Sequence, residues 1–161
     1  MHIRPADAAE LDALALLWHE GWRDGHAHLA PPGLVQARTP ERFRERLAAA
    51  LSDTFVIGAP GAPDGFFMLR GDELYQFFVA RSARGSNVAP ALLDAAEAEL
   101  ARRGFTTAWL ACAVGNDRAA RFYGKRGWRN ARTQTNRLET PDGVFAIEHW
   151  RFEKRMKESV R

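Results

Sequence analysis

The spacing of apolar residues in the first third of the chain predicts one short strand and two helices. "HIRPAD" has the pattern of a strand that Pro5 ends, and Asp7 follows as a helix cap. In the helix that starts there, apolar residues recur every three or four positions and share one face: Leu11, Leu14, Trp18 and Trp22. "GHAHLAPPGL" is a predicted loop. Thr39 and Pro40 open a second helix, whose expected buried residues are Phe43, Leu47 and Leu51.

The middle of the chain changes from helical spacing to continuous apolar runs. "TFVIGA" and "GFFMLRG" flank the turn sequence "PGAPDG", so we expect a hairpin, and "ELYQFFVA" is a third strand. Between Asn87 and Arg103 the period is helical again, and Gly104 is a suitable stop. The residues of this helix that we expect to point inward are Ala89, Leu92, Leu93, Ala96 and Leu100.

The last third predicts a buried strand, a short helix and two more strands. "TTAWLACAV" is apolar on both faces, which is typical of a central strand. "DRAARFYGKRG" is helical, and Gly127 releases a strand near Trp128. "NRLETPDGVFAIEHWRFEKRM" predicts a hairpin with "PDG" as its turn. The element order favours an α/β (α+β) fold, a mixed sheet with helices on both faces, in a single domain over residues 1–161.

The composition fits a soluble globular domain. A chain of 161 residues can bury one core, and 46% hydrophobic with 27% charged residues is ordinary for this class. Cys112 is the only cysteine, so an internal disulfide is excluded and a reducing, cytoplasmic location is expected. Met1 is followed by no signal-peptide pattern, and no apolar run has the roughly 20 residues of a membrane span. We expect no membrane partner.

The charge distribution favours a small anionic ligand over a nucleic acid. The 23 Lys and Arg exceed the 20 Asp and Glu by only +3. The arginines are spread along the chain without a lysine-rich block, which argues against nucleic-acid binding even though the calculated pI is near 9.5. A small positive excess suits an anionic small molecule.

Residues 79–100, "VARSARGSNVAPALLDAAEAEL", pass from strand to helix through side chains of little bulk. Such a turn directs several backbone N–H groups into one hollow at the positive end of the helix dipole, which suits a phosphate. Gly85 lets the main chain come close, and Ser86 and Ala89 are small. Asn87 tolerates a left-handed conformation, and Arg84 adds positive charge. A plain turn is the alternative interpretation.

Two other phosphate-binding loops are excluded by the residues present. The chain has no Gly-Lys-Ser/Thr, which the P-loop requires. The dinucleotide fingerprint needs three glycines and a later acidic residue, and only Gly85 is present here.

Two segments resemble motifs of the GNAT superfamily of N-acetyltransferases. "RGSNVA" after a strand is similar to the family's acyl-CoA-binding loop, Arg/Gln-x-x-Gly-x-Gly/Ala. Arg81 or Arg84 opens the pattern, Gly85 holds, and "VA" matches its end, while Asn87 stands where the family usually has its middle glycine. "VGNDRAARFYGKRGWR", residues 114–129, resembles the next motif, an asparagine before a short helix ending in Phe-Tyr-x-x-x-Gly-Phe/Trp. The two together cover about residues 74–128.

The resemblance implies a GNAT-like fold with acetyl-CoA as cosubstrate and no metal. About seven mostly antiparallel strands and about four helices are expected, with the strand before the loop and "TTAWLACAV" splayed around the thioester. Backbone N–H groups near Phe78 and Val79 would polarise the thioester carbonyl, and Asn116 would bind the pantetheine arm or cap its helix. The implied CoA-binding residues are Phe78, Val79, Arg84, Gly85, Ser86, Asn87, Val88, Ala89, Asn116 and Arg121.

The activity implied by the resemblance is transfer of an acetyl group to a primary amine of a small molecule or peptide, by direct attack in a ternary complex. Tyr123 is the implied acid for the leaving thiolate, with a core aromatic as the alternative role. No covalent intermediate is needed, so Cys112 is interpreted as core packing.

The base that accepts the proton of the amine is left open by the sequence. Glu73 starts the strand before the loop, and the other candidates are His26, His28, Glu148 and His149. We expect the first two helices and the last hairpin to wall the acceptor pocket, with Trp22, His26 and His149 in contact with the substrate and Trp18 in the core.

Two further interpretations concern the role of the whole chain. A non-catalytic acyl-CoA-binding regulatory module would keep the phosphate loop but need no acid, so Tyr123 favours the enzyme. The edge strands of the late hairpin are suited to pairing in a homodimer.

Overall fold

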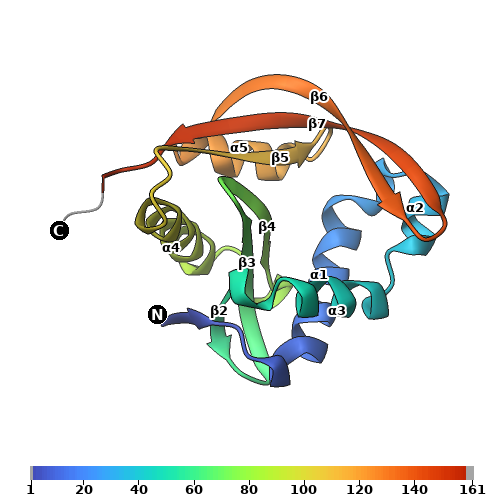
Figure 1. Cartoon of the computed structure of the whole chain (residues 1–161), viewed down its shortest axis with the longest axis horizontal. Coiled ribbons are helices and arrows are strands. Elements are labelled where there is room, and N and C mark those ends of the chain that lie inside the picture. The colour runs from blue at the N-terminus through green and yellow to red at the C-terminus, as the bar shows by residue number, and fades with distance from the viewer. Residues whose placement is uncertain (1, 159–161) are drawn as a thin grey trace.

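The computed structural model describes residues 2–158 and shows seven strands and five α-helices in that part of the chain (Figure 1). The strands are β1 Ile3–Pro5, β2 Thr54–Ala59, β3 Ala62–Arg70, β4 Glu73–Val79, β5 Thr107–Ala113, β6 Arg129–Thr140 and β7 Gly143–Arg155. The helices are α1 Leu11–Gly25, α2 Pro32–Ala37, α3 Pro40–Ala49, α4 Val88–Arg102 and α5 Asp117–Lys125. None of these helices is long and apolar enough to cross a membrane.

All strands belong to one mixed sheet in the order β1-β2-β3-β4-β5-β7-β6. Neighbours pair antiparallel except β4 and β5, which are parallel because α4 connects them. The mostly antiparallel sheet of about seven strands is therefore confirmed. β6, the first strand of the predicted hairpin, lies at one edge of the sheet, and the homodimer through this edge stays a prediction.

Three elements differ from the sequence prediction. The predicted loop 25–34 runs into α2, because Pro32 is preset for a first helical turn and Leu34 and Ala37 are buried there. Asp7 caps a 3-10 turn at Ala8–Glu10, and α1 follows that turn directly. β6 begins at Arg129, earlier than the predicted hairpin sequence. It pairs with β7 from Arg129 to Thr140, so the two strands form one long hairpin.

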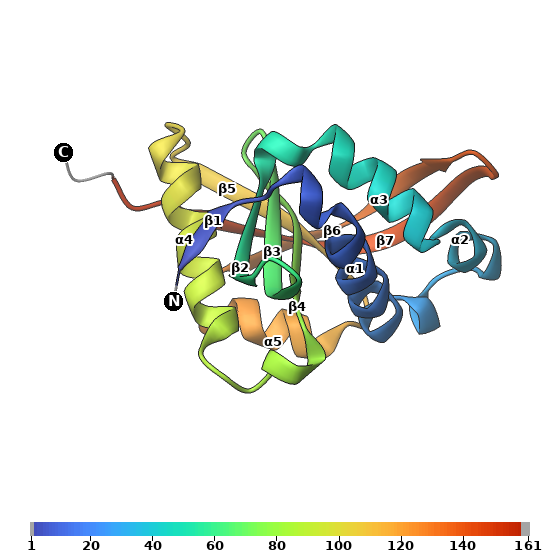
Figure 2. The ribbon, with the colours of Figure 1, turned by 90° about the horizontal axis from the view of Figure 1, so that it is seen from below.

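Alternation along the central strands divides the buried residues between two cores, one on each face of the sheet. Phe66 and Met68 of β3 pack with α1 and α3, while Phe67 and Leu69 pack with α4 and α5. Trp18 is completely buried in the first core, as the sequence predicts. Figure 2 shows the helices distributed around the sheet.

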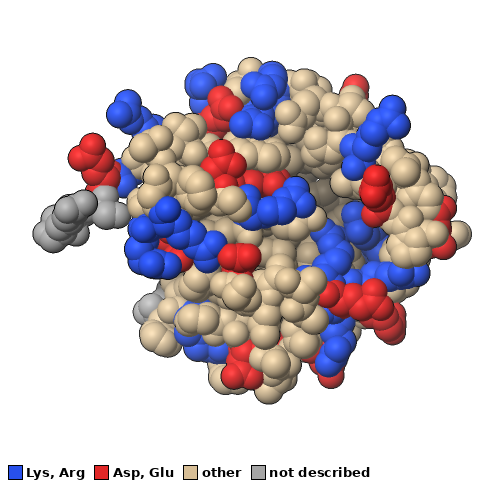
Figure 3. All heavy atoms as spheres, viewed as in Figure 1, with Lys and Arg blue, Asp and Glu red and all other residues tan. Residues whose placement is uncertain are grey.

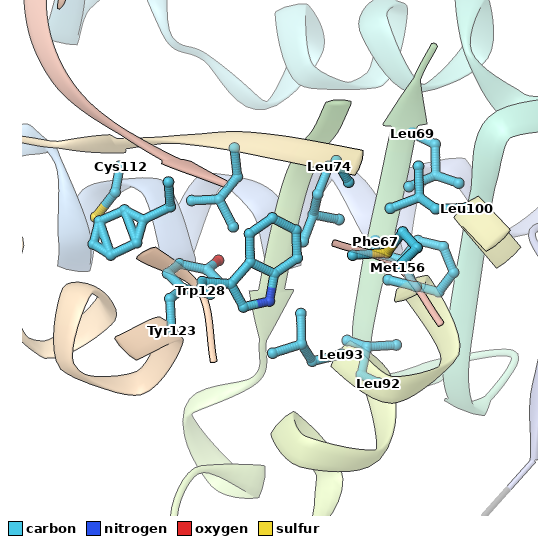
Figure 4. Packing of buried hydrophobic residues seen from close by; sticks show 14 of the residues in the cluster. Phe67, Leu69, Leu74, Leu92, Leu93, Leu100, Cys112, Tyr123, Trp128 and Met156 are labelled. Carbon is cyan, nitrogen blue, oxygen red and sulfur yellow. The ribbon is translucent and has the colours of Figure 1, made fainter. Parts of the chain in front are cut away.

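The core beneath α4 and α5 extends to the segment that carries the motif residues. Leu92 and Leu93 of α4 are fully buried in it. Figure 4 shows Cys112 and Tyr123 at one end of this cluster, with Leu100 at the other. The motif side chains are thus held by the same packing that holds the helix after the loop.

Two glycines one turn apart allow α1 to approach the centre of the sheet. A Cβ placed on Gly21 would overlap the ring of Phe78 on β4. A Cβ on Gly25 would lie 3.1 Å from the amide nitrogen of Asn116. Close contact of α1 with β4 and with the β5–α5 connection therefore depends on the missing side chains.

We expect Gly21→Ala to lower the free energy of unfolding by about 1–2 kcal/mol, because the overlap with Phe78 outweighs the better helix propensity of alanine. Gly124 in α5 is the matched control, since a Cβ there meets no atom within 4 Å. Gly124→Ala should raise the same free energy by about 0.5–1 kcal/mol. Urea unfolding of both variants measures the difference, and equal stability changes would show that α1 is not tightly packed here.

Candidate functional site

The centre of the sheet opens where β4 and β5 separate. Their only registered pair is Glu73 with Trp109, next to a bond from the Trp109 N–H to the Asp72 carbonyl of 3.2 Å. Beyond this pair a cavity of about 290 Å3 lies between the strands. It is lined by β4, β5, α5, the loop before α4 and the end of α1.

A register shift in β4 helps to produce this separation. Met68 of β3 pairs with Gln76, and the next residue, Leu69, pairs with Leu74. Tyr75 is therefore an extra residue without a counterpart, the arrangement of a β-bulge, which bends a strand and redirects its side chains. Tyr75 is one of the residues that line the cavity.

The backbone of β4 beyond the bulge presents unpaired groups to the gap. The Ala80 N–H donates to the Asp64 carbonyl on the β3 side. Because alternate residues face the same neighbour, the Phe78 N–H also faces β3 and the Val79 N–H faces the gap. Of the two predicted backbone donors, Val79 thus has the suitable direction, while Phe78 contributes its ring to the cavity wall.

The loop between β4 and α4 leaves alternate N–H groups without a partner. The N–H groups of Arg84, Ser86 and Val88 donate to acceptors inside the loop. Those of Gly85, Asn87 and Ala89 have no hydrogen-bond partner among residues 2–158. Gly85 and Ala89 also line the cavity. Three free donors at the N-terminus of a 15-residue helix form an anion-binding arrangement.

The conformation of this loop depends on Gly85 and on Ser86. Gly85 has φ +77°, the left-handed region, and nothing lies within 4 Å of a Cβ placed on it. Asn87, for which the sequence suggested that conformation, has φ −81° and is the N-cap of α4 without a side-chain bond. The hydroxyl of Ser86 accepts from the Val88 N–H at 3.3 Å and so performs the capping.

Asp24 of α1 connects the loop to the opposite face of the sheet. It accepts from Arg81 at 2.8 Å and from Arg84 at 3.0 Å. These two guanidinium groups hold the pKa of the Asp24 carboxyl below its usual value. The pairing of Asp24 with these arginines has no local signal in the sequence, because the partners lie about 60 positions away.

The segment after β5 places both an amide and a cation at the cavity. Asn116 lines the cavity, and its Oδ1 accepts from the Ala119 N–H at 3.4 Å. The same side chain thus caps α5 and forms part of the cavity lining. Arg121, the predicted contact, is exposed and is not part of the lining. Arg118, one turn earlier on α5, takes that place.

Tyr123 and Cys112 form the apolar side of the cavity. Both are buried, with 8% and 4% of their surface exposed, and both contribute to the lining. Burial, with a smaller effect of Cys112, raises the pKa of the Tyr123 phenol, which keeps it protonated. Burial raises the pKa of the Cys112 thiol to about 12, so this group is not a thiolate nucleophile at neutral pH.

His26 lies on the α1 side of the cavity. Its ring stacks on Trp22 at 6.1 Å between centroids, and its Nδ1 is buried without a hydrogen-bond partner in the described part of the chain. Burial, then the charge of His149, lowers the pKa of His26 to about 4. Trp22 and His149 do not line the cavity: Trp22 stacks on His26, and the charge of His149 acts on His26 from nearby. Burial also lowers the pKa of His149.

The remaining predicted bases lie elsewhere. Glu73 is at the closed end of the two strands, 5% exposed and bonded to Arg70 at 2.9 Å, and it is not part of the cavity lining. Burial raises the pKa of Glu73. His28 and Glu148 line a second depression of about 450 Å3 between the α1–α2 connection and β7. Glu73 stays a prediction as a base, and its position is less direct than that of His26.

More than half of the predicted site residues thus line the cavity, together with residues that the sequence did not indicate. Predicted residues in its lining are His26, Phe78, Val79, Arg84, Gly85, Ala89, Asn116 and Tyr123. The additional ones include Gly21, Gly25, Tyr75 and Arg118. Two glycines spaced by four inside a helical pattern were a usable signal of close approach. Residues 2–158 contain no group of three His, Cys, Asp or Glu arranged to hold a metal ion.

No curated protein sequence is significantly similar to the chain. Solved structures do match it in fold. The GCN5-related N-acetyltransferase "Aminotransferase, Class-II" from Rhodopseudomonas palustris has 22% identity and a TM-score of 0.73 over 96% of this chain and 95% of that one. The ribosomal-protein-alanine N-acetyltransferase from Brucella melitensis has 18% identity and a TM-score of 0.71 over 97% and 100% of the two chains.

A third structure is yncA from Salmonella typhimurium, solved with its cofactor acetyl-CoA. It has 14% identity and a TM-score of 0.70, with 100% of this chain and 96% of that chain covered. At such identities these structures show the common fold. The sequence model of the Acetyltransferase (GNAT) family matches residues 16–128, which is more than half of the chain. The protein therefore belongs to the acetyltransferase (GNAT) family.

Proposed function

We propose that this protein transfers an acetyl group from acetyl-CoA to a primary amine of a small molecule or peptide by direct attack in a ternary complex. The observation that carries the proposal is the set of free N–H groups at Gly85, Asn87 and Ala89, at one end of a cavity that reaches Tyr123. The acetyl-CoA complex of yncA, which shares the fold, supports the choice of cosubstrate.

The loop would bind the pyrophosphate of CoA, and the pantetheine arm would then enter between β4 and β5. Arg84 places a positive charge in the loop, and this charge also forms an ion pair with Asp24. The Val79 N–H faces the gap and would donate to the thioester carbonyl. Because charge on that oxygen grows during attack, such a donor stabilises the tetrahedral intermediate more than the bound thioester.

Two proton transfers complete the reaction. Tyr123 is held protonated beside the cavity and would donate to the departing thiolate. A primary amine is mostly protonated at neutral pH and has to lose a proton before it attacks. Of the residues that the sequence suggested as base, only His26 lines the cavity, and burial keeps its imidazole neutral, the form that accepts a proton.

Gly85→Glu should reduce acetyl-CoA affinity by at least about 100-fold, because the carboxylate would stand among the N–H groups meant for phosphate. Calorimetric titration with acetyl-CoA measures this change. Gly104→Glu is a matched control: Gly104 also has positive φ and open surroundings, but it follows the other end of α4. Similar affinity in the two variants would remove the loop from the site.

Tyr123→Phe should lower kcat by about 100-fold or more while acetyl-CoA affinity changes little, because only the proton donor is removed. Thiol release with a panel of primary amines gives kcat, and calorimetry gives the affinity. Cys112→Ala tests the alternative of an acyl-thiol intermediate, and direct attack predicts that its turnover persists. Unchanged kcat in Tyr123→Phe would reject the acid role. If the protein binds acetyl-CoA but releases no CoA thiol with any of the amines, a non-catalytic module would be favoured.

The free energy of unfolding should decrease as the pH is lowered from 6.5 to 4, because of His26. Its folded pKa of about 4 lies below the ordinary value of 6.5, so in this window the unfolded chain binds more protons than the folded one. The full difference corresponds to about 2–3 kcal/mol lost at pH 4. Chemical unfolding of His26→Gln at pH 7 and pH 4.5 should show a smaller loss than the natural chain. His28→Gln, at an exposed position, should leave the loss unchanged.

A further inference from the structure

Two arginines on the α1/α3 side of the sheet have no acidic partner. Arg38 follows α2 and Arg46 lies on α3. Neither forms an ion pair within residues 2–158, whereas nearby Arg44 pairs with Asp12 and Arg70 with Glu73. Figure 3 shows a hollow on this view of the molecule, bordered by side chains of both charges.

Arg46 connects this cluster to the cavity. Its guanidinium lies 4.4 Å from the centroid of Trp18 and donates to the Tyr75 hydroxyl at 2.8 Å. Tyr75 is the extra residue of the β4 bulge, and it lines the cavity. The cation is thus held in place by an aromatic ring and a phenol, with no carboxylate to neutralise it.

The position of Arg38 is energetically unfavourable when no anion is bound to it. Its Nε is buried without a hydrogen-bond partner in the described residues. Burial, then the like charge of Arg46, lowers the pKa of Arg38 to about 10. The charge of Arg38 also contributes to the low pKa of His26, so it lies within electrostatic reach of the cavity wall. A buried donor and two unneutralised like charges destabilise a fold unless an anion joins them.

The phosphates of CoA are not the expected anion at this place. The loop that would bind them precedes α4, and α4 packs on the other face of the sheet from α3. Arg38 and Arg46 lie on the α1/α3 side of the sheet, where Arg46 donates to Tyr75, and neither arginine lines the cavity itself. An anionic group located there would be part of the acceptor.

We propose that Arg38 and Arg46 bind a carboxylate or phosphate group of the acceptor, so that the substrate is an amine that also carries negative charge. This inference rests on the proposed acetyl transfer and specifies its substrate class. Arginine suits the role because its planar donors bind either anion in a fixed orientation. The anion would hold the acceptor while its amine reaches the thioester between β4 and β5.

The deciding experiment measures product binding to the CoA-loaded protein, which needs no turnover. Calorimetric titrations would compare N-acetyl amino acids with their carboxamides, and N-acetylphosphoethanolamine with N-acetylethanolamine. The charged member of at least one pair should bind more tightly, and Arg38→Gln should weaken its binding about 10- to 100-fold while leaving the neutral member unaffected. Whether the acids or the phosphate show the effect identifies the group.

Arg44→Gln is the matched control, because it removes the same charge from an exposed position on α3 and should not change binding. Arg38→Gln should fold at least as stably as the natural chain, since it removes a partly buried cation that has no acidic partner within residues 2–158, and Arg46→Lys provides a second variant. Equal binding of charged and neutral members, or equal effects of Arg38→Gln and Arg44→Gln, overturns the proposal. If no amine causes release of the CoA thiol from acetyl-CoA, acetyl transfer itself is rejected, whatever the titrations show.

Discussion

The separation of β4 from β5 is the constraint on which the site depends. Two parallel neighbours in a sheet normally satisfy each other's backbone groups, yet these strands meet only at Glu73 and Trp109. The extra residue at Tyr75 turns β4 away, and the unpaired edge is then available to a ligand. A substrate that lies in the gap can take the hydrogen bonds of the missing strand partner. The proposed binding site is therefore also the place where the sheet lacks internal pairing.

The helices keep this opening at a defined width. α1 comes close because Gly21 and Gly25 have no side chains, and Asp24, on the same helix, binds Arg81 and Arg84 beyond the end of β4. The loop that we propose for phosphate binding is thus tied to α1, the helix on the proposed acceptor side. A change at one end of α1 would affect how both substrates are positioned.

The sequence predicted the parts of the site that have local signals. The element order followed from apolar periodicity, and Gly85 and Tyr123 lie in motifs of adjacent residues. The bulge at Tyr75 had no such signal, because it is defined by the register with β3. The partnership of Asp24 with the loop and the isolation of Arg38 depend on segments distant in sequence. Contacts of this kind follow from the tertiary fold, which a linear pattern of residue types does not specify.

Two ionisable groups in the cavity lining are uncharged, because burial keeps the Tyr123 phenol protonated and the His26 imidazole neutral. The anchors that we propose belong to other segments: the free N–H groups of the loop before α4, and the guanidinium groups of Arg38 and Arg46. A neutral, poorly solvated centre strengthens the effect of fixed N–H dipoles on charge that develops during reaction. Anchoring both substrates by charges outside the centre would therefore align them without placing an ion where the new bond forms.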